Sequence, residues 1–168
     1  MQYLLQLFFD ICRLRRGPQD VPAAGSLFVL LLTAGILFDT MTYFFELSFF
    51  ESFYFSALIN LILLAVMALL LQIMGYAARI LQTLTAMLGV SLIISVLHFP
   101  VWVMIVMEPN DPGLFGFIHL IFLLWSLTVN SHILRHALSI PVFPASVLSI
   151  GYLMLNYIVA GFLFPQAG

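Results

Sequence analysis

Three ionisable side chains interrupt stretches of sequence that are otherwise apolar: Asp39, His98 and His119. A carboxylate and imidazoles at such positions can hold a cation or pass a proton, which are common roles of ionisable groups inside membrane helices. Burying an aspartate at the centre of a membrane helix costs roughly 2.5–3.5 kcal/mol on insertion scales, so its presence requires a partner or a function. We therefore expect an Asp39–His98 or an Asp39–His119 hydrogen bond.

Two asparagines lie at a depth similar to that of these three residues. Counted along a helix at 1.5 Å per residue from the polar flank of each apolar stretch, Asp39 lies ~10 Å inward and the other four residues lie ~12–15 Å inward. The predicted buried polar layer therefore consists of Asp39, Asn60, His98, His119 and Asn156.

Each residue of this layer belongs to a stripe of small or polar residues at helical spacing. The stripes are Gly35, Asp39, Thr42 and Glu46; Ser56 and Asn60; Ser91, Ser95 and His98; His119, Ser126 and Asn130; and Ser149, Tyr152 and Asn156. Such stripes usually face neighbouring helices and hold bundles together by hydrogen bonds, so a structural role is the more frequent one. A pathway for protons or ions is the alternative. Pro100 removes a backbone donor, so we expect a helix kink there.

Other patterns for catalysis or metal binding are missing from the sequence. It contains no phosphate-binding glycine loop, no Gly-x-Ser-x-Gly elbow and no His-Glu-x-x-His pair. His132 and His136 are one turn apart, but no third metal ligand lies near them in the sequence. The single cysteine, Cys12, cannot form an internal disulfide, and we expect a buried, unreactive thiol. We therefore expect no enzymatic activity, no cofactor and no metal site.

The elements that must position the polar layer are five long apolar stretches. Hydrophobic residues make up 64% of the 168 residues and charged residues only 7%, against about a quarter in soluble domains. A membrane core about 30 Å thick needs about 20 apolar residues per spanning helix. The stretches that meet this length are Ser26–Phe45, Phe53–Met74, Thr83–Met107, Leu114–Leu134 and Pro144–Phe164. The predicted fold is an all-α polytopic membrane protein with five transmembrane helices in one bundle.

A shorter segment precedes the bundle. Its polar residues recur at helical spacing, and Arg13, Arg15 and Arg16 lie at its carboxyl end, where a helix favours cations. We expect an amphipathic interfacial helix over residues 1–17, anchored by these arginines in the headgroup layer, and a transmembrane domain over residues 18–168. Tyr43, Tyr54, Tyr76 and Trp102 are expected in the aromatic belts at the membrane surfaces.

The charged residues predict how the chain is threaded. All five arginines precede the first stretch or lie in alternate connections, and the chain has no lysine. Because cytoplasmic loops are enriched in basic residues, we expect a cytoplasmic amino terminus and a periplasmic carboxyl terminus in a bacterial inner membrane. The net charge of −2 offers no surface for nucleic acid. The expected partners are membrane lipids and other membrane proteins, or further copies of the chain.

Several sequence features occur together along most of the chain. They are the five closely spaced stretches, the ending Arg15-Arg16-Gly17-Pro18, the connection Gly75-Tyr76-Ala77-Ala78-Arg79-Ile80-Leu81-Gln82-Thr83-Leu84, and the block Trp125-Ser126-Leu127 with Ile133-Leu134-Arg135-His136-Ala137-Leu138. In these features the chain resembles the Yip-type membrane proteins, above all their compact bacterial members. The resemblance implies an integral membrane protein without catalytic residues. Eukaryotic members bind GTPases of membrane traffic through a long cytosolic region that this sequence does not contain, so we do not expect GTPase binding.

Two functions remain open from the sequence. The first is a non-enzymatic organiser or accessory subunit of the inner membrane that binds partner membrane proteins or lipids. The second is a small proton-coupled carrier or channel subunit that uses the buried Asp/His layer.

Overall fold

The computed structural model describes residues 2–108 and 113–163, and in these ranges all regular structure is helical. The helices are α1 (Gln2–Cys12), the short 3-10 helix η1 (Pro18–Asp20), α2 (Gly25–Tyr43), α3 (Phe49–Ile73), the 3-10 helix η2 (Ala77–Arg79), α4 (Ile80–Met107), α5 (Gly113–Leu138) and α6 (Val142–Leu163). Five helices, α2 to α6, are long and apolar enough to cross a membrane. The prediction of a multi-pass all-α membrane protein is confirmed.

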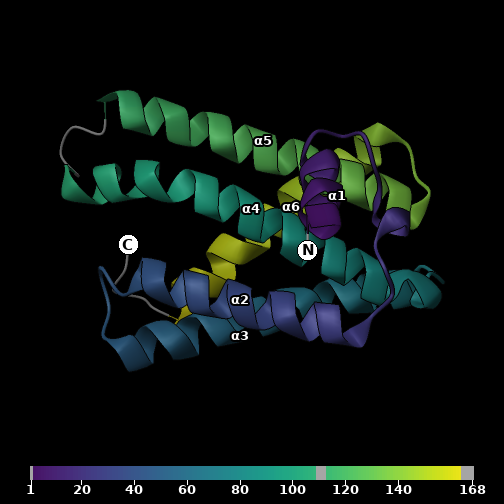
Figure 1. Cartoon of the computed structure of the whole chain (residues 1–168), viewed down its shortest axis with the longest axis horizontal. Coiled ribbons are helices and arrows are strands. Elements are labelled where there is room, and N and C mark those ends of the chain that lie inside the picture. The colour runs from purple at the N-terminus through teal and green to yellow at the C-terminus, as the bar shows by residue number, and fades with distance from the viewer. Residues whose placement is uncertain (1, 109–112, 164–168) are drawn as a thin grey trace.

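The five long helices form a closed ring. α2 contacts α3 and α4, α5 contacts α4 and α6, and α6 contacts α3, so the order around the ring is α2, α3, α6, α5, α4. Figure 1 shows α4 and α5 along one side, α2 and α3 along the other, and α6 crossing obliquely between them. Arg79 and Arg135 lie at the end of the bundle where α4 begins and α5 ends, which we call the arginine end. The opposite end, near Glu46 and Glu51, is the acidic end.

Local signals explain where the helices start and stop. Ser48 and Glu51 form a capping box in which the Glu51 side chain accepts from the Ser48 backbone N–H at 3.1 Å. This box starts α3 at Phe49, four residues before the predicted start. Gly75, with a φ of 82°, follows α3 as predicted because glycine adopts this left-handed conformation without strain. Pro144 lies in the first turn of α6, also as predicted. Residues 109–112 of the predicted turn between α4 and α5 lie outside the described residues.

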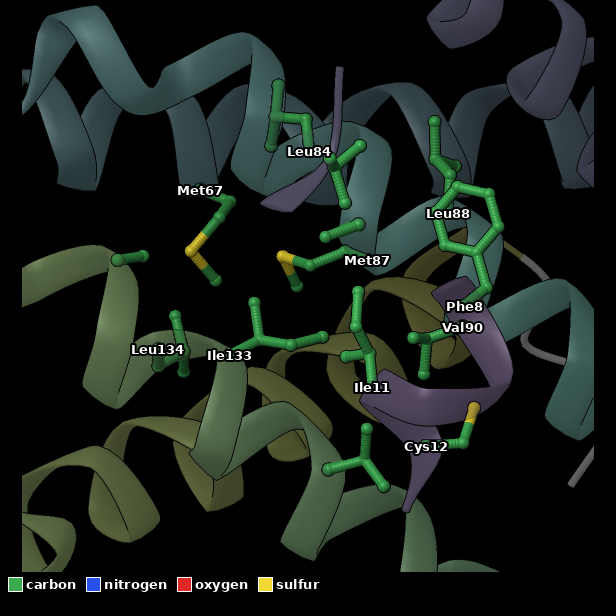
Figure 2. Packing of buried hydrophobic residues seen from close by; sticks show 14 of the residues in the cluster. Phe8, Ile11, Cys12, Met67, Leu84, Met87, Leu88, Val90, Ile133 and Leu134 are labelled. Carbon is green, nitrogen blue, oxygen red and sulfur yellow. The ribbon is translucent and has the colours of Figure 1, made fainter. Parts of the chain in front are cut away.

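The apolar core is concentrated in the half of the ring near the arginine end. Every residue of α4 from Thr83 to Val90 is buried, because α1, α2, α3 and α5 all contact this helix. Figure 2 shows side chains from neighbouring helices meeting here. They include Ile11 of α1, Met67 of α3, Met87 of α4 and Ile133 of α5, each 5% exposed or less. α4 is therefore the central helix of this half.

The first helix, α1, packs crosswise against α4 and α5 (Figure 1). Leu7, Phe8, Ile11 and Cys12 form its buried face. The Phe8 ring lies so close to Gly89 of α4 that a Cβ atom at Gly89 would be 2.5 Å from it. The indole Nε1 of Trp125 donates to the backbone carbonyl of Cys12 at 3.0 Å, which satisfies an acceptor at the end of α1.

The prediction that residues 1–17 form an interfacial helix is not confirmed. The helix ends at Cys12, and one of its faces packs against α4 and α5, while Tyr3, Leu5 and Phe9 stay exposed. Its neighbours Gly89 and Trp125 lie ~14 Å and ~20 Å along α4 and α5 from the arginine end. Burial raises the pKa of the Cys12 thiol to about 11, which agrees with the predicted unreactive cysteine.

Two arginines have structural partners. Nη1 of Arg79 donates to the carbonyls of His136 and Ala137 and to the Ser139 hydroxyl at 2.9–3.3 Å. A cation in this position satisfies the free carbonyls and the negative dipole end of α5. Arg16 pairs with Asp10 at 3.5 Å, a partly exposed contact that stabilises little.

The contact between Phe8 and Gly89 gives a testable prediction. We expect Gly89→Ala to displace α1 and to destabilise the protein by about 1–3 kcal/mol, because the added methyl group overpacks the site. Displacement exposes Cys12, so maleimide labelling of this thiol should become faster in the folded protein.

Gly151→Ala is the matched control, because no atom lies within 4 Å of a Cβ at this α6 position. Its labelling rate should equal that of the parent. Equal rates for both variants would contradict the proposed role of Gly89.

Candidate functional site: a polar cavity inside the helix ring

The middle of the ring encloses a cavity of about 310 Å³. This volume far exceeds the ~15 Å³ that one water molecule requires. All five long helices contribute to its wall. The polar lining residues are Asp39, Tyr43, Asn60, Ser91, Ser95, Ser126, Asn130, Ser149, Tyr152 and Asn156.

A hydrogen bond between α2 and α3 positions the acidic group of the cavity. Nδ2 of Asn60 donates to Oδ2 of Asp39 at 2.8 Å and to the Ser56 carbonyl at 2.9 Å. The second bond orients the amide along α3, and both of its N–H groups are then used. The Oδ1 atoms of Asp39 and Asn60 remain without a hydrogen-bond partner among the described residues, so they are available to a ligand.

The predicted bonds between Asp39 and a histidine are wrong. Asp39 pairs with Asn60, whereas Nδ1 of His119 lies 2.8 Å from Nε2 of His98. At this distance one nitrogen must carry a hydrogen and the other must accept it. The pair therefore joins α4 to α5, as Asp39 and Asn60 join α2 to α3. The order of the helices around the ring decides which of these residues meet.

A second cavity of about 180 Å³ lies next to the first. Asp39, Tyr43 and Ser95 line both cavities, and His98 lines the second. Phe99 and Trp102 close part of its wall. The Asp39 carboxylate and the histidine pair thus share one polar region between α2 and α4, although no hydrogen bond joins them in the described part of the chain.

Most polar side chains that line the main cavity have no hydrogen-bond partner within the described residues. Ser126 and Ser149 donate to the backbone carbonyls of Leu123 and Leu127. By contrast, several lining side chains make no hydrogen bond within residues 2–108 and 113–163: Tyr43, Ser91, Ser95, Asn130, Tyr152 and Asn156. Unpaired amides and hydroxyls in a membrane protein are costly, so this lining is suited to a polar ligand or to water.

The cavity is closed toward the arginine end. A small extension of about 60 Å³ beyond Asn60 and Asn130 ends against Leu64, Met87 and Leu88. These three residues belong to the apolar core around α4. The site is therefore a pocket in the described structure, lined near the middle of α3 to α6 and by the last turns of α2.

The structure brings together part of the predicted polar layer. Asp39, Asn60 and Asn156 line the main cavity, while His98 and His119 form a separate pair beside it. Ser91, Ser95, Ser126, Asn130, Ser149 and Tyr152 also line the cavity, and their stripes were visible in the sequence.

Tyr43 and Pro100 lie near this polar layer. Tyr43, the last residue of α2, lines the cavity and packs edge-on against Phe55 at 4.6 Å between ring centroids, and its predicted place in a membrane-surface belt stays a prediction. α4 remains helical on both sides of Pro100, and the predicted kink there stays a prediction.

The histidines at the arginine end do not make a metal site in the described residues. The rings of His132 and His136 lie 4.5 Å apart, and Nε2 of His132 donates to the Arg16 carbonyl at 2.9 Å. Within residues 2–108 and 113–163, no group of three or more histidine, cysteine, aspartate or glutamate side chains is placed to hold a metal ion.

No protein-family model matches the chain, and no curated protein or solved structure matches it. What the cavity binds must therefore follow from its own geometry and chemistry.

The bond between Asp39 and Asn60 gives the prediction for this site. Asn60→Leu should destabilise the protein by about 1–3 kcal/mol, because it leaves a half-buried carboxylate without its donor. The double variant Asp39→Leu/Asn60→Leu should recover part of this loss. Thermal unfolding in detergent measures each effect.

Asn130→Leu is the control, because the Asn130 amide has no hydrogen-bond partner among the described residues. Its cost should be smaller than that of Asn60→Leu. Purely additive effects in the Asp39/Asn60 pair would contradict a coupled interaction.

Proposed function

We propose that this protein is a non-enzymatic, multi-pass membrane protein that binds a small polar or cationic molecule in the cavity inside its helix ring. The observation that carries the proposal is the set of polar side chains that all five long helices contribute to one cavity, most of them without a hydrogen-bond partner among the described residues. Binding sites of small molecules commonly combine an apolar wall with a few convergent polar groups, and they often lie between the helices of a bundle.

The charge of the lining selects the class of ligand. Among the described lining residues, Asp39 is the one carboxylate, and none is arginine, lysine or histidine. An anion in this cavity would meet a carboxylate without a compensating cation. A neutral hydrogen-bonding molecule or a small organic cation therefore fits better, since it can accept from the hydroxyls and amides and donate to Asp39.

The closed floor of the cavity favours binding over conduction. The apolar core around α4 separates the polar residues from the arginine end, so a single chain offers a pocket rather than a pore. We therefore favour an accessory or receptor-like component that works with lipids or partner membrane proteins.

A proton-coupled carrier is the second candidate. The observation in its favour is the neighbouring cavity, in which Asp39 and His98 are both exposed to the same space. Asp39 can take up a proton, and the His98–His119 pair provides a second acceptor. A carrier differs from a binding protein in one measurable property, which is flux of protons or solute across vesicles.

Cysteine accessibility tests the proposed cavity. In a Ser95→Cys variant, a small cationic methanethiosulfonate reagent should react roughly tenfold faster than an anionic one, a difference of ~1.4 kcal/mol. Asp39 causes this preference, so Asp39→Asn in the same background should remove it. The reaction is followed by mass spectrometry of the protein in detergent.

Two matched controls make this test specific. Thr83→Cys places a thiol on the same helix at a position that is 0% exposed, and it should stay unmodified. Glu46→Gln removes a carboxylate of the acidic end that does not line the cavity, and it should leave the preference unchanged. Equal rates for the two reagents in Ser95→Cys would reject a cation-selective cavity.

The location is part of the proposal. We propose a bacterial inner membrane, with the arginine end and the amino terminus in the cytoplasm and the carboxyl terminus in the periplasm, because Arg79 and Arg135 lie at one end of the ring and glutamates lie at the other. An alkaline phosphatase fused after Gly168 should be active, and a fluorescent protein that folds only in the cytoplasm should stay dark there. The reverse result would overturn the orientation.

A further inference from the structure

A groove of about 370 Å³ runs along the outside of the bundle between α5 and α6, apart from the central cavity. One stripe of α5 contributes Leu124, Leu127, Thr128, Ser131, His132 and Arg135. α6 contributes Val142, Ser146 and Ile150, and Leu14 faces the groove from the turn after α1. Since Leu124 is 62% exposed and Ile150 is 49% exposed, the groove is open to the surroundings of the bundle.

The wall of this groove is effectively apolar. The Thr128 hydroxyl donates to the Leu124 carbonyl at 2.7 Å, and Ser146 donates to the Val142 carbonyl at 3.0 Å. The Ser131 hydroxyl lies 2.9 Å from that of Ser146 and donates to it. Because these hydroxyls bond to each other or to backbone carbonyls, the wall can accommodate a hydrocarbon chain without leaving a donor unpaired.

The length of the groove matches one leaflet of a membrane. From Leu124 to Arg135 the α5 stripe extends ~16 Å at 1.5 Å per residue. Half of a hydrocarbon core about 30 Å thick is ~15 Å. An acyl chain that lies in this groove would therefore end near Arg135, at the depth of a lipid headgroup.

The charge at the end of the groove is positive and uncompensated. Arg135 is exposed and has no hydrogen bond or ion pair within residues 2–108 and 113–163, unlike Arg79 and Arg16. His132 lies one turn before it, and no acidic residue lines the groove. Arg13 and Arg15, which flank Leu14 in the chain, are also exposed and without an ion-pair partner in the described residues.

We propose that this groove binds one anionic phospholipid of the leaflet at the arginine end, with an acyl chain along α5 and α6 and its phosphate at Arg135. An arginine recognises phosphate by charge and by paired N–H donors. The apolar wall and the basic end together require an amphiphile, which neither a free phosphate nor an uncharged lipid supplies. This site is separate from the central cavity and does not depend on what that cavity binds.

Native mass spectrometry of the full chain in non-ionic detergent tests the site. The probes are phosphatidylglycerol and phosphatidylcholine with identical acyl chains, titrated separately. The parent should retain one phosphatidylglycerol at least fivefold better than phosphatidylcholine. Arg135→Gln should weaken retention of phosphatidylglycerol about fivefold, because one arginine near anionic lipid is lost.

A matched pair of tryptophan substitutions tests the groove itself. Thr128→Trp fills the groove and should reduce retention of both lipids, while Thr33→Trp places the same side chain on the exposed face of α2 and should behave as the parent. Circular dichroism verifies the helical fold of each variant. If Arg135→Gln does not fold, the tryptophan pair still decides whether the groove holds the lipid.

Other occupants give different results. The proposal would be overturned if the parent retained the two lipids equally, or if both tryptophan variants lost lipid binding to the same extent. Displacement of the lipid by millimolar inorganic phosphate would also overturn it. A protein dimer whose formation is blocked by Thr128→Trp would assign the groove to a second copy of the chain instead. The expected result is a monomer that carries one anionic lipid.

Discussion

A closed ring of five helices encloses a central space, and the way this space is filled determines the rest of the structure. Near the arginine end, α4 lies at the centre of its neighbours and contacts α3 as well as α2 and α5, so apolar side chains fill the space. Gly89 allows α1 to approach α4 from outside and adds a further layer. Farther along the helices a smaller apolar cluster around Phe55, Ile59 and Leu63 packs α3 against α6. Beside it, hydroxyls, amides and the Asp39 carboxylate line the cavity. The cavity thus results from the dense packing of one half and the open ring of the other.

The two halves have opposite energetic roles. Dense packing of apolar side chains gains dispersion contacts that lipid alone does not provide, and this holds membrane helices together. The polar half contributes little stability, since interhelical hydrogen bonds in membranes average only ~0.6 kcal/mol. Asp39 illustrates the energetic cost of burying polar groups. One of its carboxylate oxygens accepts from the Asn60 amide, and the other has no hydrogen-bond partner among the described residues. Such an arrangement is more easily explained by ligand binding than by stabilisation, since a fully apolar pair would pack without unpaired groups.

The sequence was sufficient for features that depend on one helix at a time. Apolar length predicted the five spans, and depth along each span placed Asp39, Asn60 and Asn156 near one level. Features that depend on which helices are neighbours were not predictable, because the azimuth of each helix and the order of the ring are tertiary properties. This is why Asp39 was expected to pair with a histidine, whereas it pairs with Asn60. The start of α3 at Phe49 is a different case, because it depends on one helix alone. The Ser48–Glu51 capping box that sets it was visible in the sequence.

The arginines illustrate how a charge that sets topology can also have a local partner. Any basic residue in a cytoplasmic loop biases the orientation in which a chain inserts into the membrane. Arg79 and Arg135 are therefore equivalent for the predicted topology. Their surroundings differ, because Arg79 satisfies carbonyls at the end of α5 and has little capacity left for lipid. Arg135, on the same helix end, has no such partner among the described residues and stands at the end of an apolar groove. Hydrogen bonding within the protein, rather than position in the loop pattern, therefore decides which basic residue is free to recognise an anionic headgroup.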